Sequence, residues 1–457
     1  MAASGGTAPV WSSRVAFYLA TVGGAVGLGS IWRLPYLVGS NGGSAFIVVF
    51  VLACLLIATP LLAAEFMIGR RSRRSPPDAA GTVAAMSGRS TKWNVIGVLG
   101  TIAVVAVISY YEVIAGWVLA YTWKCASGQL AGLSQAEVGK LWSAFLASPV
   151  EMGAWHLAFL AIVGHISSRG VGRGLELAAK VRAPVLLVLL LILMLYAFAT
   201  GDVVRGMRFA FEPNIGAITP AVILAAIGQA FYATGVGMAM MIAMGSYVSA
   251  GTSLVRTSVI ITASILLVSL LATLTIFPLV FRYGMNPAQG TDLVFNVLAT
   301  VFAQMPGGRL FGTLFFLLLV FAALTPSLAG FEPAVEWLQQ DFRFSRRGAA
   351  AATTAASWVL GLGSLLSFNR WSGWHPLGAL AMFRDKTFFD AIDFISSNLM
   401  LPAGAVLTSV FVGWLVSRRI LSEELSETAP LAATLVVWLL RFVCPIAIGA
   451  VLVSALW

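Results

Sequence analysis

Long apolar runs alternate with short polar segments along almost the whole chain. Eleven runs can be drawn, at 14–37, 44–69, 94–123, 153–168, 181–200, 218–247, 254–283, 310–338, 349–368, 388–417 and 429–456. An apolar run of about 20 residues is long enough for an α-helix to cross the hydrocarbon core of a bilayer. Because lipid offers no hydrogen bonds, each run should satisfy its own backbone as a helix. The pattern predicts an all-α, polytopic membrane protein with eleven transmembrane helices.

Composition narrows the class of protein further. Of the 457 residues, 59% are hydrophobic and 10% are charged, against roughly 25% charged in a typical soluble domain. No stretch is polar enough for a separate soluble domain, so we expect one transmembrane domain over 1–457. Disorder and a collagen-like structure are excluded. The net charge of +10 lies in short clusters between the runs, where membrane topology explains it better than a nucleic-acid partner does.

The basic clusters predict an orientation. Arg70, Arg71, Arg73 and Arg74 follow the second run, Arg169 and Arg173 follow the fourth, and Arg343, Arg346 and Arg347 follow the eighth. Loops rich in Lys and Arg stay on the cytoplasmic side. We therefore expect a cytoplasmic N-terminus, with segments 124–152 and 284–309 outside. Within the first of these, LSQAEVG (133–139) is typical of a short helix start.

Glycine clusters interrupt two of the runs. GGAVGLGS (23–30) lies in the first run and ATGVG (233–237) in the sixth. Glycine costs a helix about 1 kcal/mol per position, so both clusters predict unwound backbone. The breaks correspond if about 14–200 and about 218–417 are two inverted repeats, with an extra helix at about 429–456. Paired broken helices indicate a mid-membrane site in a secondary transporter. The alternative is close helix packing through Gly-x-x-x-Gly contacts, a spacing that Gly23 and Gly27 have.

Several motifs then resemble one family. GGAVGLGSIWRLPY (23–36) with NGGSAF (41–46) is similar to the first-span signature of the neurotransmitter:sodium symporters, which have the LeuT-type 5+5 inverted-repeat fold. Weaker motifs follow in the same order: AEFMIGR (64–70), SYY (109–111), GRGLE (172–176), GQAFY (228–232), FAALT (321–325) and FFDAIDF (388–394). The ending resembles the shorter bacterial branch. The resemblance implies a sodium-coupled amino-acid transporter of the bacterial inner (plasma) membrane, with no nucleic-acid or obligatory protein partner.

The resemblance also implies a substrate site in the broken region. Its residues would be Gly24, Ala25, Gly27, Leu28, Gly29, Val107, Tyr111, Tyr232, Ala233, Gly235, Met238, Pro326 and Gly330. An amino-acid carboxylate at this depth needs donors, which unwound backbone and the Tyr111 hydroxyl would supply. Tyr111 could also be an ordinary core tyrosine. The walls are apolar, so we expect a neutral, hydrophobic amino acid, without knowing which one.

By the same resemblance, Arg33 and Asp393 form an outer gate and Tyr232 lies beneath it as a lid. Trp11 belongs to an inner gate, although Ala8 and Gln340 replace the charged pair usual there. Glu65 would bond to the exposed backbone of the broken sixth span. A weak, surface-like ion pair suits a gate, because it is worth only about 0–1 kcal/mol and can break in every cycle.

The sodium sites depart from the family pattern. The first keeps the Ala25 carbonyl, but Ser30 stands in place of an amide, Ala233 replaces a hydroxyl, and the span-seven amide or acid falls near Ser264 or Ile265. The second keeps Gly23, Val26, Ala322 and Thr325, but Pro326 replaces a hydroxyl and has none to offer. Two readings stay open, Na⁺ symport and sodium-independent exchange. No chloride site is expected, because Phe50 and Ala233 replace a tyrosine and a hydroxyl residue.

Arg182 raises a further hypothesis, because its guanidinium could replace Na⁺ as a fixed cation near the second site. The sequence favours the plainer alternative, an anchor that reaches to lipid headgroups. A non-transporting receptor on the same fold is also possible. An enzyme is the weakest reading, since His156, His165 and His375 lie far apart and no nucleophile–base pair or metal-ligand spacing occurs.

Overall fold

The computed structural model describes residues 18, 21–23, 26–170, 177–249, 251–287, 293–425 and 430–456, and within these ranges the regular structure is entirely helical. Nine helical segments there are long and apolar enough to cross a membrane. They are Ser44–Ser72, Thr91–Ala126, Pro149–Ser168, Lys180–Thr200, Leu254–Arg282, Gly308–Gln340, Arg346–Leu366, Phe388–Leu415 and Pro430–Ala455. The predicted all-α membrane class is confirmed, and each segment lies within a few residues of a predicted run.

The first and sixth predicted runs are not among these nine segments. In the first, residues 21–23 are helical, Val26 and Gly27 lie in a bend, and the π-helix η1 (Gly29–Arg33) continues into α2 (Leu34–Ser40). The sixth consists of α11 (Pro220–Thr234) and α12 (Met240–Ser246) with a gap between them. Helix length therefore does not confirm the count of eleven, and the two missing spans are the two with predicted breaks.

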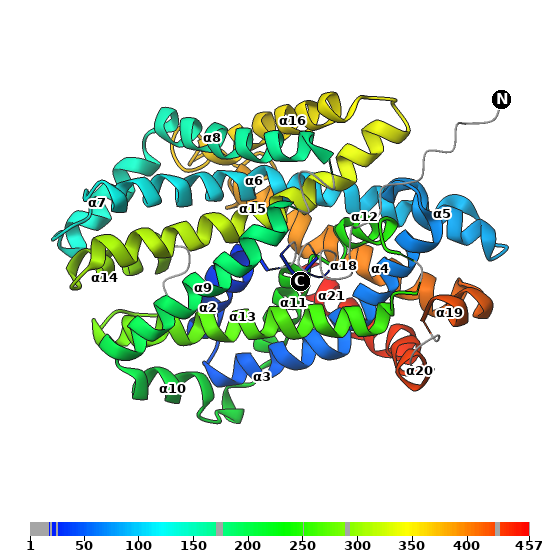
Figure 1. The fold of residues 1–457 in the computed structure, drawn as a ribbon, viewed down its shortest axis with the longest axis horizontal. Coiled ribbons are helices and arrows are strands. Elements are labelled where there is room, and N and C mark those ends of the chain that lie inside the picture. Colours follow the sequence, from blue (N-terminus) through cyan, green and yellow to red (C-terminus); the bar gives the residue numbers. More distant parts are fainter. Residues whose placement is uncertain are drawn as a thin grey trace.

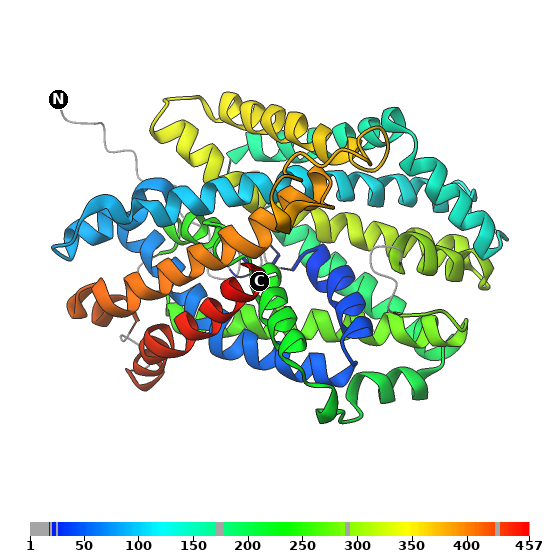
Figure 2. The same cartoon turned by 180° about the vertical axis from the view of Figure 1, so that it is seen from behind.

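The long helices run side by side along one axis of the molecule (Figure 1). α6 (Val95–Ala126) and α15 (Gly308–Gln340) cross the middle, with α8 (Pro149–Ser168) and α16 (Arg346–Leu366) along one edge. α3 (Ser44–Ala53) and α13 (Leu254–Arg282) lie along the opposite edge, and the view from behind agrees (Figure 2). α6 packs directly against α15, α8 and α16. The two broken elements lie near the centre of this bundle.

The other α-helices either belong to the remaining spans or connect them. The remaining helices are α4 (Thr59–Ser72), α5 (Pro76–Met86), α7 (Gln135–Leu146), α9 (Leu177–Thr200), α10 (Val203–Phe211), α14 (Ala299–Gln304), α17 (Phe388–Asp393), α18 (Leu401–Val410), α19 (Arg418–Leu425), α20 (Pro430–Trp438) and α21 (Cys444–Leu456). α7 starts at the predicted place, where Ser134 and Glu137 form a capping box. We call the end with α5 and α19 the basic end, because the arginines after α4 lie there.

A close approach of α4 to α12 fixes the second half of the broken sixth span. A Cβ atom on Gly69 of α4 would lie 2.0 Å from the carbonyl oxygen of Ile242 in α12. Only glycine allows the two backbones to come so near. The same helix α4 carries Glu65, so its position also places that carboxylate against the break.

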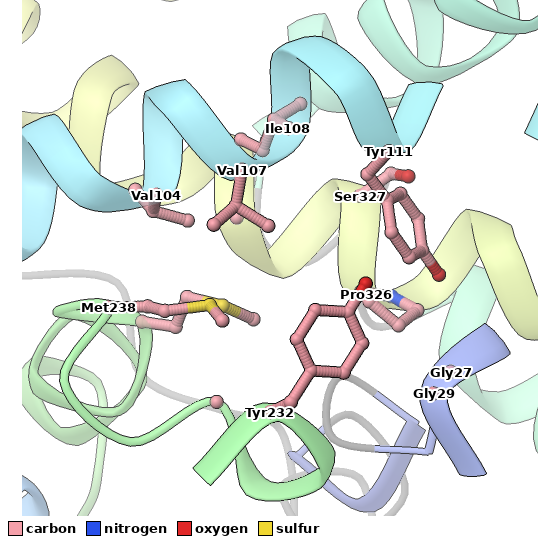
Figure 3. Close-up of a pocket in the computed structure, with 13 residues that line it drawn as sticks. Gly27, Gly29, Val104, Val107, Ile108, Tyr111, Tyr232, Met238, Pro326 and Ser327 are labelled. Carbon is pink, nitrogen blue, oxygen red and sulfur yellow. The ribbon is translucent and has the colours of Figure 1, made fainter. Parts of the chain in front are cut away.

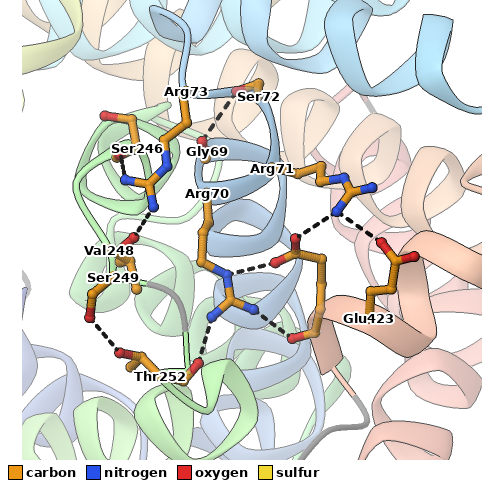
Figure 4. A network of polar contacts seen from close by, with 11 residues as sticks. Gly69, Arg70, Arg71, Ser72, Arg73, Ser246, Val248, Ser249, Thr252 and Glu423 are labelled. Carbon is orange, nitrogen blue, oxygen red and sulfur yellow. Dashed lines mark hydrogen bonds and ion pairs between the residues drawn. The ribbon is translucent and has the colours of Figure 1, made fainter. Parts of the chain in front are cut away.

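A network of arginines ties α4 to distant segments at the basic end (Figure 4). Arg70 pairs with Glu424 of α19 at 2.6 Å and also donates to the Thr252 and Glu424 carbonyls. Arg71 pairs with Glu423 at 2.9 Å, and Arg73 donates to the Ser246 and Val248 carbonyls. We call this set of side chains (Arg70, Arg71, Arg73, Glu423 and Glu424) the basic-end clamp. It joins the second span, the segment after α12 and the helix α19.

Candidate functional site

The break in the sixth span contains three residues with positive φ, Gly235, Gly237 and Ala239. α11 ends at Thr234, Gly235 and Gly237 have φ of 68° and 84°, and α12 starts at Met240. Glycine adopts this conformation without steric cost, which is why the glycine cluster predicted the gap. Ala239 also has a positive φ, 57°, which costs a residue with a Cβ about 1–2 kcal/mol.

A buried carboxylate bonds to the exposed backbone of this break. The N–H of Gly237 donates to Glu65 Oε1 at 2.7 Å, and Glu65 is 1% exposed. On the other broken span, Gln229 Nε2 of α11 donates to the Gly29 carbonyl at 2.8 Å. The first contact satisfies a backbone N–H that no helix satisfies, and the second joins α11 to the start of η1.

A cavity lies between the two breaks and α6 (Figure 3). It is lined by Gly27, Gly29, Val104, Val107, Ile108, Tyr111, Tyr232, Gly235, Met238, Met240, Pro326, Ser327 and Gly330. Apolar side chains from α6 face Met238 and the Tyr232 ring across it. The lining is therefore suited to a molecule with an apolar part.

The Tyr111 hydroxyl gives the cavity a polar end. The Leu28 N–H donates to Tyr111 Oη at 3.3 Å, and Tyr111 is 6% exposed. A Cβ on Gly27 would lie 2.5 Å from Pro326 Cγ and 3.1 Å from Tyr111 Oη, so the first-span backbone touches both groups. Because this hydroxyl accepts from Leu28, its own proton remains for an acceptor in the cavity.

Most of the predicted substrate residues line this one cavity. Of the others, Leu28 contributes its N–H to Tyr111, and Ala233 is buried next to the break. Gly24 and Ala25 lie outside the described residues. The sequence reasoning missed Val104, Ile108, Met240 and Ser327. Val104 and Ile108 lie on the same face of α6 as Val107 and Tyr111, at helical spacing. That spacing is a signal that could have identified them.

The predicted outer-gate residues gather around Tyr232. The Arg33 guanidinium lies over the Tyr232 ring, with Cζ 4.4 Å from its centroid. The Ser397 hydroxyl donates to Asp393 Oδ1 at 2.9 Å, and the Tyr110 hydroxyl lies 3.1 Å from Ser397 Oγ. Within the described part of the chain, Arg33 and Asp393 do not form an ion pair. The predicted inner-gate Trp11 lies outside the described residues, and Gln340 accepts from the Ser75 N–H.

The first predicted sodium site keeps few free oxygens. Ser30 Oγ is buried and has no hydrogen-bond partner among the described residues. Ser264 Oγ already donates to the Ile260 carbonyl at 2.8 Å, and Ile265 is fully buried. Ala233 offers only a methyl group. Ser30 is therefore the side chain of this set whose oxygen makes no hydrogen bond among the described residues, and Ser264 Oγ keeps its lone pairs because it only donates.

The second predicted sodium site brings the broken first span into contact with α15. A Cβ on Gly23 would lie 2.8 Å from Thr325 Cγ2, so these residues are in contact. Thr325 Oγ1 donates to the Phe321 carbonyl at 3.2 Å, which leaves its lone pairs available. Val26 and Ala322 are buried nearby in sequence. Pro326 packs its ring against Gly27 and contributes no oxygen, so this set is incomplete on that side.

Arg182 does not lie at the lipid surface. The side chain is in α9, which packs against α13 and α15, and the residue is 6% exposed. An anchor that reaches to headgroups would be exposed on the outside of the bundle. The interpretation that the sequence favoured is therefore wrong, because protein atoms cover this side chain.

The comparisons with known proteins cover nearly the whole chain. The sequence model of the sodium:neurotransmitter symporter family matches residues 8–143 and 147–457. An uncharacterized sodium-dependent transporter of Bacillus subtilis, YhdH, is 37% identical over 441 residues, 96% of this chain and 95% of that protein. An uncharacterized sodium-dependent transporter of Haemophilus influenzae is 30% identical over 456 residues, 98% of each chain. The crystal structure of MhsT in complex with L-phenylalanine matches with a TM-score of 0.89 and 36% identity, covering 98% of this chain and 100% of that one.

These matches establish the class of protein. The fold is of the LeuT type, as the motifs implied, and the family consists of membrane transporters and not of enzymes. The family match covers both breaks and the residues that line the cavity. The chain belongs to the sodium:neurotransmitter symporter family.

Proposed function

We propose that this protein transports a neutral, hydrophobic amino acid by alternating access, coupled to Na⁺. One observation carries the proposal: an apolar cavity between two broken helices meets the Tyr111 hydroxyl and the Leu28 N–H at one end. A zwitterion with an apolar side chain needs these two environments side by side. The likeness to MhsT, whose structure contains L-phenylalanine, supports the same class of substrate.

The polar end would hold the amino-acid backbone. The carboxylate would accept from the Tyr111 hydroxyl and from N–H groups at the start of η1, where the helix dipole favours an anion. The ammonium group would face carbonyls at the end of α11, where the break at Gly235 leaves acceptors without helical partners. Charge-assisted hydrogen bonds of this kind are about twice as strong as neutral ones.

The apolar wall would hold the side chain. Val104, Val107 and Ile108 line one side, and Met238 and Met240 line the floor. Methionine adapts to differently shaped partners, because its side chain is flexible and polarizable. A Cβ on Gly330 would lie 3.0 Å from Ile108 Cδ1, so glycine at this position lets α15 approach the apolar wall closely. We therefore expect large apolar substrates, such as leucine, methionine or an aromatic amino acid.

Transport would follow from closing the two ends in turn. Arg33, Tyr232 and Asp393 would close over the substrate on the outer side, and movement of the broken helices would open the other side. In this proposal the basic end and the N-terminus face the cytoplasm of a bacterium. Na⁺ would enter as co-substrate against Gly23 and Thr325, and chloride would not be required.

Uptake into proteoliposomes tests this directly. Purified protein would be reconstituted and given labelled phenylalanine, leucine or alanine, with Na⁺ outside or replaced by K⁺ or choline. The proposal expects Na⁺-dependent uptake of the larger substrates. Binding without uptake would instead indicate a receptor, and uptake of none of the neutral amino acids would overturn the proposal.

A second candidate is sodium-independent exchange, favoured by one observation. Pro326 stands where the second sodium site needs a hydroxyl, and its ring packs on Gly27. In this case Arg182, which lies inside the protein, would act as a fixed cation. Uptake that requires an internal amino acid but no Na⁺ would select this function. Arg182→Ala should then abolish exchange or create a Na⁺ requirement, and a variant with neither change would exclude the role of Arg182.

A further inference from the structure

A second intramembrane carboxylate lies directly after the substrate-site tyrosine. Glu112 follows Tyr111 in α6, is 0% exposed, and neither carboxyl oxygen has a hydrogen-bond partner within the described ranges. A buried ionised carboxylate without partners costs several kcal/mol. Ionisable groups inside a membrane are rare and generally belong to ion or substrate pathways. Glu112 therefore needs either a cation or a proton.

No cation is placed to neutralise it. The titratable side chains on the elements packed against α6 are Asp78 of α5, Lys92 of η3 (Thr91–Asn94), Glu151, His156 and His165 of α8, Arg309, Glu332 and Glu336 of α15, Arg346 and Arg347 of α16, and Asp390 and Asp393 of α17. Arg346 pairs with Glu332 at 2.6 Å, and Lys124 of α6 itself pairs with Glu151 at 2.8 Å. None of the described residues forms an ion pair with Glu112. A proton is the remaining way to remove its charge.

The neighbouring hydroxyl accommodates the protonated form. The Ser327 hydroxyl of α15 faces the Glu112 carboxyl and donates its one proton to the Ala323 carbonyl at 2.9 Å. It can therefore only accept from Glu112, and a carboxylic acid has a proton to donate while a carboxylate has none. If the Ser327 hydroxyl donated to Glu112 instead, it would lose its hydrogen bond to the Ala323 carbonyl. The Glu112 carboxylate would then have only one hydrogen-bond donor for its full negative charge.

Ser327 also lines the substrate cavity, directly after Pro326. A hydrogen bond from protonated Glu112 to Ser327 would join α6, which carries Tyr111, to the part of α15 that touches Gly27. Loss of the proton would leave a bare charge between these two helices at the level of the cavity.

We propose that Glu112 is a proton-binding site coupled to the substrate cavity, and that the form with a proton donated to Ser327 is the form that binds the amino acid. This inference rests on the proposed function. The chemistry is a binding equilibrium only, in which the carboxylate takes one proton from water and returns it on release. The proton would be a third bound species, beside the amino acid and Na⁺. Its binding would matter most in a chain whose sodium sites are weakened by Ala233 and Pro326. Glu112 acts through Ser327, so it is a positioning residue.

Uptake as a function of pH tests the proposal at fixed Na⁺. Protonation is linked to binding, so the apparent affinity of the wild type for phenylalanine should weaken by about fivefold or more between pH 6 and pH 9. In Glu112→Gln the ratio of the apparent affinities at pH 6 and pH 9 should fall below about twofold, because an amide donates at every pH. Ser327→Ala should move the loss of affinity to lower pH. The matched control is Glu336→Gln, a buried acid that accepts from Ser246 away from the cavity, and it should keep the wild-type ratio.

Thermal unfolding in detergent, without substrate, separates this inference from the proposed function. If the folded protein holds a proton on Glu112, the wild type should lose stability from pH 6 to pH 9, and Glu112→Gln should lose less. Uptake absent in every variant, with this melting difference present, would reject the proposed function and retain the proton site. Equal pH ratios in wild type and Glu112→Gln, in both uptake and melting, would reject the proton site.

Discussion

The cavity and the basic-end clamp lie in the same bundle and treat polar groups in opposite ways. In the clamp, Arg70 donates hydrogen bonds to the Glu424 carboxylate and to two carbonyls. The Arg70 and Glu424 side chains are only 8% and 10% exposed. Around the cavity, Ser30 Oγ, one Glu65 oxygen and both Glu112 oxygens are buried without partners among the described residues. One region is internally complete, and the other is not.

This difference separates a structural site from a binding site. Buried polar groups in folded proteins are nearly always hydrogen-bonded, so a cluster of exceptions calls for a missing partner. In the clamp the partners are already in the chain, and they join segments that must stay together. At the cavity the missing partners fit an amino acid, a cation and a proton. If this distinction is right, substitutions in the two regions should affect different measurements.

The largest effect is expected from Gly27→Ala at the cavity. The new Cβ would lie 2.5 Å from Pro326 Cγ and 3.1 Å from Tyr111 Oη, so the first span or the tyrosine must move. A displacement of about 1 Å at a binding centre can cost about 100-fold, and we expect phenylalanine uptake to fall at least that far. The matched control is Gly228→Ala in α11, where a Cβ meets nothing within 4 Å. Equal uptake by the two variants would contradict the close contact at Gly27.

The next effect is expected in the clamp, on stability. Arg70→Gln leaves the buried Glu424 carboxylate without its main partner, and breaking a buried pair in this way costs about 3–5 kcal/mol. We expect a lower melting temperature in detergent, with an apparent affinity for phenylalanine close to that of the wild type. Replacement of both partners, Arg70→Gln with Glu424→Gln, should recover part of the loss, because no unpaired charge remains. A variant with unchanged melting but weaker substrate binding would reverse the roles that we assign to the two regions.

The sequence predicted the fold well because its signals are local. Apolar run lengths predict spans, and glycines such as Gly235 and Gly237 predict a break, since a positive φ is a property of one residue. Ala239 has the same backbone conformation and gave no signal, because only the packing around it imposes that φ. The basic cluster after α4 was interpreted only as an orientation signal. Its partner Glu424 lies 354 positions further along the chain, and no local pattern links the two.

The candidate site was predicted mainly by resemblance to a family, and that resemblance did not point to several residues at or beside the cavity. Val104 and Ile108 could have been found from helical spacing around Val107. Glu112 could also have been found, because an acid in the middle of an apolar run is a signal by itself. Ser327 and Met240 could not, since their places depend on how α15 and the second break pack against α6. The burial of Arg182 depends in the same way on neighbours that are distant in sequence.

A smaller effect is expected from the polar end of the cavity itself. Tyr111→Phe removes the hydroxyl that accepts from Leu28 and would donate to the substrate carboxylate. A hydrogen bond to a charged group is worth about 1.5–3 kcal/mol, so the apparent affinity should fall by about 10- to 100-fold with little change in melting temperature. The control is Tyr196→Phe, which removes a hydroxyl that donates to the Pro306 carbonyl at 2.9 Å, away from the cavity. If both variants bind equally well, Tyr111 does not contact the substrate.

The smallest effect is expected at the exposed rim of the clamp. Arg419 pairs with Glu423 one helical turn away, and its side chain is 85% exposed. The hydrogen bond from Arg419 lowers the pKa of the Glu423 carboxyl below its usual value of 4.5. A lowered pKa in the folded state means that this contribution to stability is present above pH 4.5 and is lost as the pH falls through the lowered value. Arg419→Gln should therefore leave melting at pH 7 almost unchanged, because exposed ion pairs contribute little, and should slightly reduce the loss of stability below pH 4.5. A large change at pH 7 would mean that the rim is as structurally important as the buried Arg70–Glu424 pair, and the clamp would then depend on total charge and not on burial.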